Sequence, residues 1–92
     1  MIRIDLPPIM DRGAVAGCLD ELRDAFAGSE GVEISCNRVE QIGMAGLQLL
    51  ASAVRTSRNG GTALSFAGVD GSAVESSAAL AGMADILFGD AR

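Results

Sequence analysis

The sequence contains no histidine, lysine, tyrosine or tryptophan, and all seven of its basic residues are arginine. Without histidine, a Ser-His or Cys-His nucleophile pair cannot be assembled. Without lysine, neither a Schiff base nor the GxxxxGK[ST] phosphate-binding loop is available. Two cysteines are too few for the usual zinc sites, which take three or four Cys or His ligands. These absences predict a protein that is not an enzyme and holds no metal or cofactor, with only carboxylate chemistry left open.

Aromatic residues are scarce too, because the chain has three phenylalanines and no other aromatic side chain. The core must therefore be built from aliphatic residues and methionine. An apolar content of 49% over 92 residues suits one folded domain, which we expect to cover residues 1–92. The net charge of −5 disfavours nucleic acid and anionic membranes as partners, because both require a basic surface.

The two cysteines and the N-terminal segment bear on the compartment of the protein. Cys18 falls within a helical apolar pattern and Cys36 at the end of a strand pattern, so both are expected to be small buried hydrophobes in a reducing compartment. The first ten residues, MIRIDLPPIM, show no secretory signal, and no apolar run approaches the length of a membrane span. These features predict a cytoplasmic protein without direct membrane insertion.

Three segments have the composition and alternation of β-strands. They are residues 2–6, 32–36 and 62–67, and apolar side chains recur in them at every second position. Pro7 and Pro8 end the first segment, because proline supplies no N–H donor to a sheet.

Helical periodicity separates these strands. Asp11 is the expected N-cap of a first helix that runs to about Ala27 and is broken by the GSEG sequence at 28–31. A second helix is expected over residues 44–59, with the glycines after Asn59 as its stop. Ser72 and Glu75 form a capping box for a third helix that ends near Gly82, and ADILF at 84–88 predicts a short closing turn.

The alternation of strand and helix predicts a single α/β domain with a mainly parallel sheet of three to four strands and helices packed against it. Right-handed crossovers place the first two helices on the same side of the sheet if the strands are added in one direction. The residues expected to be buried are Ile4, Ile34, Leu47, Leu50, Val54, Leu64 and Phe66.

The order of these elements and the residues themselves resemble a known family. The centre of a STAS domain, the fold of anti-sigma factor antagonists, is similar to the run NRVEQIGMAGLQLLASAVRTSRNGGTALSFAGV. The family's closing segment is similar to VESSAALAGMADIL. Together the two runs cover about two thirds of the chain in the expected order.

The chain departs from the family in two respects. The usual N-terminal hairpin strand is missing, which leaves a sheet edge that a second copy of the chain could cover. The family's switch motif reads Asp-Ser-Ser/Thr-Gly-Leu, and a partner kinase phosphorylates its second hydroxyl residue. Aligned on Gly46 and Leu47, this chain has Gly43, Met44 and Ala45 at the first three positions. The resemblance thus implies a STAS-like domain fixed in its unphosphorylated state.

The expected site is the start of the second helix, comprising Gly43, Met44, Ala45 and Gly46, with Arg38 as a further partner contact. A phosphate at a helix N-terminus would be held by free N–H groups, and Met44 offers a soft apolar contact in its absence. The alternative interpretation is purely structural: Gly43 supplies a left-handed turn, the small residues allow close packing, and Arg38 is simply solvated.

Three classes of function stay open at this stage. The resemblance favours a protein-interaction module of bacterial signalling, whose partner is an anti-sigma factor kinase or a related signalling protein such as those of chemotaxis pathways. A STAS subunit of a bacterial phospholipid-transport ABC complex is the alternative, although such proteins usually carry threonine where this chain has Ala45. The third class is a small-molecule sensor, for which the sequence shows no pocket signature.

Overall fold

A computed structural model describes residues 1–28 and 31–89. Its elements, in chain order, are β1 (Ile2–Asp5), β2 (Ile9–Met10), α1 (Arg12–Ala27), β3 (Val32–Ser35), β4 (Gln41–Ile42), α2 (Met44–Gly60), β5 (Leu64–Ala67), α3 (Ala73–Leu80) and α4 (Ala84–Phe88). The expected strands and helices are all present, with ends that differ from the predictions by at most two residues.

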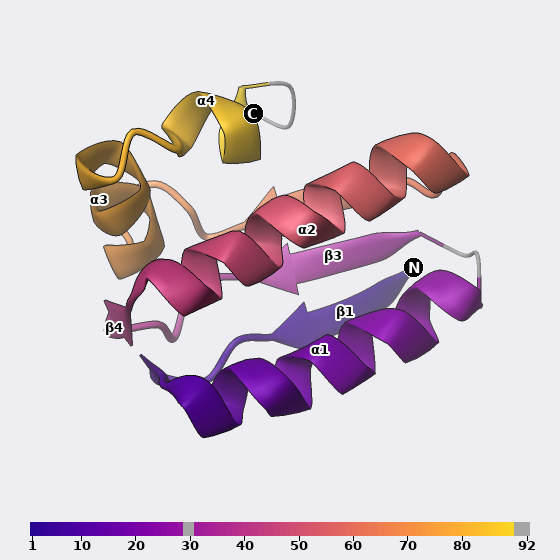
Figure 1. Ribbon diagram of the computed structural model, residues 1–92, viewed down its shortest axis with the longest axis horizontal. Coiled ribbons are helices and arrows are strands. Elements are labelled where there is room, and N and C mark those ends of the chain that lie inside the picture. The colour runs from indigo at the N-terminus through magenta and orange to yellow at the C-terminus, as the bar shows by residue number, and fades with distance from the viewer. Residues whose placement is uncertain (29–30, 90–92) are drawn as a thin grey trace.

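The main sheet has three strands in the order β1-β3-β5, and both pairings are parallel. In the register, Ile4 lies opposite Ile34, which in turn lies opposite Phe66. Helices α1 and α2 run side by side on one face of this sheet, while α3 and α4 pack near the N-terminal half of α2 (Figure 1). The α/β class, the parallel sheet and the shared side of the first two helices are therefore as predicted.

A second, two-stranded sheet was not predicted. Strands β2 and β4 pair in parallel, with Ile9 opposite Gln41 and Met10 opposite Ile42. Pro7 and Pro8 do end β1, but the carbonyl of Pro8 accepts hydrogen bonds from the backbone N–H groups of Glu40 and Gln41, at 2.7 and 3.1 Å. Proline cannot donate a backbone hydrogen bond but its carbonyl can accept one, and here the Pro8 carbonyl connects the segment after β1 to the loop before α2.

The helix ends follow their sequence signals. The Asp11 side chain accepts the N–H of Ala14 at 2.9 Å as the N-cap of α1, and Gly61 ends α2 with a left-handed φ of 72°. Ser72 caps α3 by accepting the N–H of Glu75, and the Glu75 carboxylate accepts the N–H of Gly71. The N–H of Ser72 donates to the carbonyl of Val69. Of the sequence expected to break α1, Gly28 is the C-cap, while residues 29–30 lie outside the described residues.

The core lies between the sheet and its helices. Ile4, Ile34, Leu47 and Leu50 are buried, as predicted. Three residues predicted to be buried are instead only partly buried, although they pack against the core: Val54, Leu64 and Phe66. Leu64 and Phe66 lie on β5, which is an edge strand of the described sheet, and Val54 lies on α2. Phe88 of α4 covers part of this edge with an edge-to-face ring contact to Phe66, at 5.1 Å between centroids.

Both cysteines are buried as free thiols, as expected. Burial raises the pKa of Cys36 from 9.0 to about 11, because the thiolate is poorly solvated in the core. Burial likewise raises the pKa of Cys18, with a smaller contribution from the negative charge of Glu21. Both side chains therefore stay protonated and unreactive near neutral pH.

These shifted pKa values predict a loss of stability in alkaline solution. Above pH 9.0 the unfolded chain releases the Cys36 proton while the folded protein retains it until about pH 11, so the free energy of unfolding falls across this window. The expected loss is at most about 2–3 kcal/mol. Urea denaturation at pH 7, 9 and 10.5 measures this loss of stability. The chain has no lysine or tyrosine, so neither side chain adds its own titration in the same pH range.

A Cys36→Ala variant is the control for this prediction. Its absolute stability will be lower at every pH because of the smaller side chain. Its pH dependence between 9 and 11 should nevertheless be shallower than that of the unmodified protein, because only Cys18 remains to titrate. Equal slopes for the two proteins would contradict the assignment of the effect to Cys36.

Candidate functional site

The start of α2 is held in place by the small β2–β4 sheet. The chain leaves the main sheet at Cys36, whose N–H donates to the carbonyl of Ala67, and then turns through Val39. The two hydrogen bonds to Pro8 and the pairing of β2 with β4 bring this loop against the segment after β1. The first turn of α2 therefore follows directly from β4, in a loop that these hydrogen bonds hold in place (Figure 1).

The N-cap of α2 is Gly43, and no side chain caps this helix. No acidic residue lies in its first turn either. A helix start of this kind leaves backbone N–H groups without intrahelical partners and carries a partial positive charge. In contrast to α1 and α3, which have Asp11 and Ser72 at their starts, α2 offers its N–H groups to an external acceptor.

The structural interpretation of Gly43 as a left-handed turn is wrong. Its φ of −100° and ψ of −172° are extended values that any residue adopts, and an added Cβ would meet no atom within 4 Å. The close approach instead occurs at Gly46, which is buried. A Cβ there would lie 2.6 Å from Cγ1 of Ile42 and 3.5 Å from Cβ of Met10. Gly46 therefore seats α2 on the small sheet, while Gly43 is free to vary.

Met44 and Ala45 are exposed, as the site hypothesis requires. The Met44 side chain keeps 52% of its surface accessible and borders a shallow hollow of about 310 Å³ between the start of α2 and α3. On the α3 side of this hollow stands Leu80, which is 90% exposed. None of the described residues that line the hollow is charged; they are Ile42, Gly43, Met44, Leu47, Ser77, Leu80 and Ala81.

Leu80 and Ile42 are site residues that the sequence did not reveal. The helical pattern of α3 assigns Val74, Ala78 and Ala81 to the inner side but gives Leu80 no role. Val74 and Ala78 are buried as predicted, whereas Ala81 is only partly buried. An exposed leucine at the end of a short helix is a weak signal taken alone. It gains meaning only from its position beside Met44, which depends on the packing of α3 against the start of α2.

Two other residues considered from the sequence lie apart from this hollow. Arg38 is exposed in the turn after β3 and is not among the residues that line the hollow. Ser52, the only hydroxyl residue between 41 and 55, lies on the side of α2 that faces α1, whereas Met44 borders α3. The structure thus joins Gly43 and Met44 to the hollow and leaves Arg38 outside it.

The start of α2 offers apolar contact surface and a partial positive charge. Within residues 1–28 and 31–89, no group of three or more histidine, cysteine or acidic side chains is arranged to hold a metal ion. Nor does this part of the chain contain a helix with the length and hydropathy needed to cross a bilayer. The site thus combines an apolar surface with backbone N–H groups that lack intrahelical partners.

The fold is that of a small α/β domain with a three-stranded parallel sheet. A family model described as "Mlab, STAS domain" matches residues 3–88, so the chain belongs to the STAS domain family. Comparison with curated proteins gave no match, and comparison with solved structures gave none either. STAS domains are generally non-catalytic and commonly bind protein partners.

The close approach at Gly46 gives a stability prediction. Gly46→Ala adds a methyl group that meets Cγ1 of Ile42, so the packed side chain or the helix must move. We expect the free energy of unfolding to fall by about 1–3 kcal/mol, even though alanine is the better helix former. Thermal or chemical denaturation measures the change.

Gly17→Ala is the matched control, because Gly17 lies within α1 with no atom within 4 Å of an added Cβ. This variant should be more stable than the unmodified protein by up to about 1 kcal/mol. A double variant with Ile42→Ala should lose the penalty at Gly46, since the clashing atoms are gone. If Gly46→Ala is as stable as Gly17→Ala, the close approach does not constrain α2.

Proposed function

We propose that this STAS domain is a non-catalytic protein-interaction module of bacterial signalling. Its partner docks on the start of α2 and on the apolar hollow between α2 and α3, which Met44 and Leu80 flank. The class of partner implied by the resemblance is an anti-sigma factor kinase or a related signalling protein of the chemotaxis type. Such a pathway places the domain in the cytoplasm.

The pairing of two exposed apolar side chains with an uncapped helix start carries this proposal. Met44 and Leu80 keep 52% and 90% of their surface accessible and line the same hollow, so together they form an apolar contact for a partner. The free N–H groups of α2 lie at the edge of the same contact and favour an acceptor or a negative charge on the partner. Together they supply hydrophobic affinity and a directional polar contact.

The residues at 43–45 remove the switch of the family while they keep its docking surface. A hydroxyl at position 45 would sit where a phosphate gains from the N-terminal dipole of α2 and repels an apolar partner. Ala45 leaves only a methyl group there, and no hydroxyl stands at Gly43 or Met44. The domain then acts by occupancy alone, as a scaffold or a sequestering protein whose output follows its concentration.

A surface that cannot be switched off also suits a permanent subunit, which keeps the second candidate open. In a phospholipid-transport ABC complex, the partner on the same surface would be another subunit of the complex rather than a kinase. The proteins encoded beside this chain identify the partner to use: a kinase-like or chemotaxis protein for the first candidate, or a permease and ATPase pair for the second. The experiment below applies to either partner.

The first test places a charge and a polar group on the docking surface. Ala45→Asp puts a carboxylate at the start of α2, where folding should be unaffected or improved by up to about 1 kcal/mol. Leu80→Ser changes a 90% exposed side chain, so stability should change by less than about 0.5 kcal/mol. Each should weaken partner binding, by about 2 kcal/mol or more for Ala45→Asp. Thermal melting and calorimetric titration measure the two effects separately.

Ile86→Ser is the control for this experiment. Ile86 is 55% exposed on α4 and does not line the hollow, so the same change of polarity there should leave the affinity unchanged. Unchanged affinity for both Ala45→Asp and Leu80→Ser would place the partner elsewhere on the domain. Equal losses at all three positions would show a general effect of surface polarity rather than a defined contact.

The second test concerns the missing switch. After incubation with ATP and the cognate kinase, we expect the segment Gln41–Arg55 to carry no phosphate, because its one hydroxyl residue, Ser52, faces α1. Mass spectrometry of the digested protein measures this. An Ala45→Ser variant restores a hydroxyl at the acceptor position and should become phosphorylated if the partner is a kinase. Stoichiometric phosphate on the unmodified segment would refute the fixed state.

A further inference from the structure

A crevice between α1 and α2 lies outside the docking surface described above. It encloses about 390 Å³, within the range of roughly 300–1,000 Å³ that small-molecule sites span. Residues three or four positions apart on the facing sides of the two helices form its walls, so that each helix contributes one continuous strip. Hydrophobic periodicity alone does not predict a pocket here, because the crevice depends on how far apart the two helices pack.

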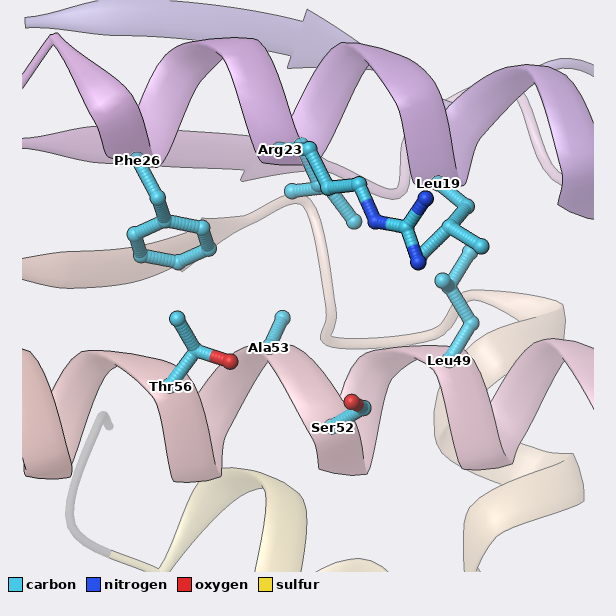
Figure 2. Close-up of a pocket in the computed structure, with 8 residues that line it drawn as sticks. Leu19, Arg23, Phe26, Leu49, Ser52, Ala53 and Thr56 are labelled. Carbon is cyan, nitrogen blue, oxygen red and sulfur yellow. The ribbon is translucent and has the colours of Figure 1, made fainter.

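The interior of the crevice is apolar along its length. Leu19 and Phe26 project from α1 toward α2, where Leu49 and Ala53 line the opposite wall (Figure 2). Leu22 of α1 also lines the crevice. Leu22, Leu49 and Ala53 are buried, while Leu19 and Phe26 are only partly covered. An apolar ligand lying in the crevice would therefore shield the two side chains that the core leaves partly open.

The rim of the crevice carries one positive charge and two hydroxyl groups. The Arg23 guanidinium lies between the two helices near Leu19 and Leu49, as Figure 2 shows, and Ser52 and Thr56 stand on the α2 side. Arg23 is the one charged residue among the described residues that line the crevice. Its helix neighbours Glu21 and Asp24 line a different hollow, against β1.

Arg23 forms no salt bridge within the described part of the chain, where the ion pairs found are those of Arg3 with Asp5 and Glu33. An arginine fork matches the geometry of a carboxylate or a phosphate, which it binds through two parallel hydrogen bonds. The protein has a net charge of −5, but the charge beside the apolar crevice is positive, so the ligand's headgroup should be negatively charged.

We propose that the crevice binds a single-chain amphiphile whose apolar chain lies between α1 and α2 and whose anionic headgroup, a carboxylate or a phosphate, pairs with Arg23. The proposal is independent of the partner-docking function, because it uses a different pair of helices. Each methylene of the ligand that the crevice buries should raise the affinity by about fourfold.

A slender chain fits this site better than a helix of a partner protein. A helix with its side chains is about 10–12 Å across and needs a broad apolar surface. Here the deepest residues are already covered by their neighbours, and Leu19 and Phe26 are the apolar lining residues that remain partly open. A single acyl chain can lie along such a strip without displacing either helix.

Titration of the intact protein with dodecanoate, below its micelle concentration, tests the proposal. The chain lacks tryptophan and tyrosine, so calorimetry and amide chemical shifts are the suitable readouts. We expect saturable binding of one ligand, with shifts concentrated at Leu19, Phe26 and Ala53. Dodecanol, which has the same chain without the charge, should bind about tenfold more weakly or worse. Dodecyl phosphate tests the second headgroup, and inorganic phosphate tests the headgroup without a chain.

Three variants connect the binding to named residues. Arg23→Gln removes the charge at an exposed position and should weaken dodecanoate binding about tenfold or more. Arg12→Gln, at the other end of α1 and outside the crevice, is the matched control and should bind normally. Ala53→Leu fills the crevice and should abolish binding of every amphiphile. Thermal melting shows whether this variant folds. If it does not fold, the Arg23→Gln variant still decides the proposal.

Each outcome decides the proposal. If dodecanoate and dodecyl phosphate bind equally well, the site accepts either anionic headgroup. If one binds more tightly, its headgroup is the one that the site prefers. The proposal is wrong if no amphiphile saturates the protein, if dodecanol or inorganic phosphate binds as tightly as dodecanoate, or if Arg23→Gln changes nothing. It is also wrong if the shifts map to the Met44–Leu80 hollow, or if a protein partner occupies the crevice while no amphiphile binds.

Discussion

The position of α2 depends on the small parallel sheet beneath its first turn. Two hydrogen bonds to the Pro8 carbonyl and the pairing of β2 with β4 fix the loop that leads into the helix. Gly46 then lets the helix approach Ile42 more closely than any other residue would allow. Since α2 borders both the hollow shared with α3 and the crevice shared with α1, both surfaces follow from this contact.

The two glycines at the start of α2 have different roles, one in close packing and one in leaving the helix uncapped. Gly46 is needed for packing, whereas Gly43 has an extended backbone and open space around it. A capping side chain at Gly43 would therefore cost nothing in packing, and its absence leaves the N–H groups of α2 free. We interpret the bare first turn as a property of the docking surface, because no requirement of folding explains it.

Signals of short range could be read from the sequence. Asp11, Ser72 and Gly61 mark helix ends because caps depend on a few neighbouring residues. The three strands and the parallel sheet follow from hydrophobic periodicity, and the family resemblance is confirmed by the match over residues 3–88. The same periodicity placed Ile4 and Leu50 in the core correctly.

Features that depend on tertiary distances could not be read in this way. Strands β2 and β4 have two residues each, which is too short for a period, and their pairing joins segments some thirty residues apart. Leu64 and Phe66 have the pattern of core residues, yet β5 lies at an edge of the sheet and leaves them partly open. Leu80 and Arg23 gain their roles only because α3 and α1 pack where they do.

We propose that a protein partner covers the uncapped start of α2, and amide hydrogen exchange in the presence of the partner tests this claim. If the claim is right, the backbone amides of Met44, Ala45 and Gly46, together with that of Leu80, exchange more slowly in the complex than in the free protein. If those amides exchange at the same rate while protection appears on another face, such as β1 or the outer side of α4, the claim is contradicted.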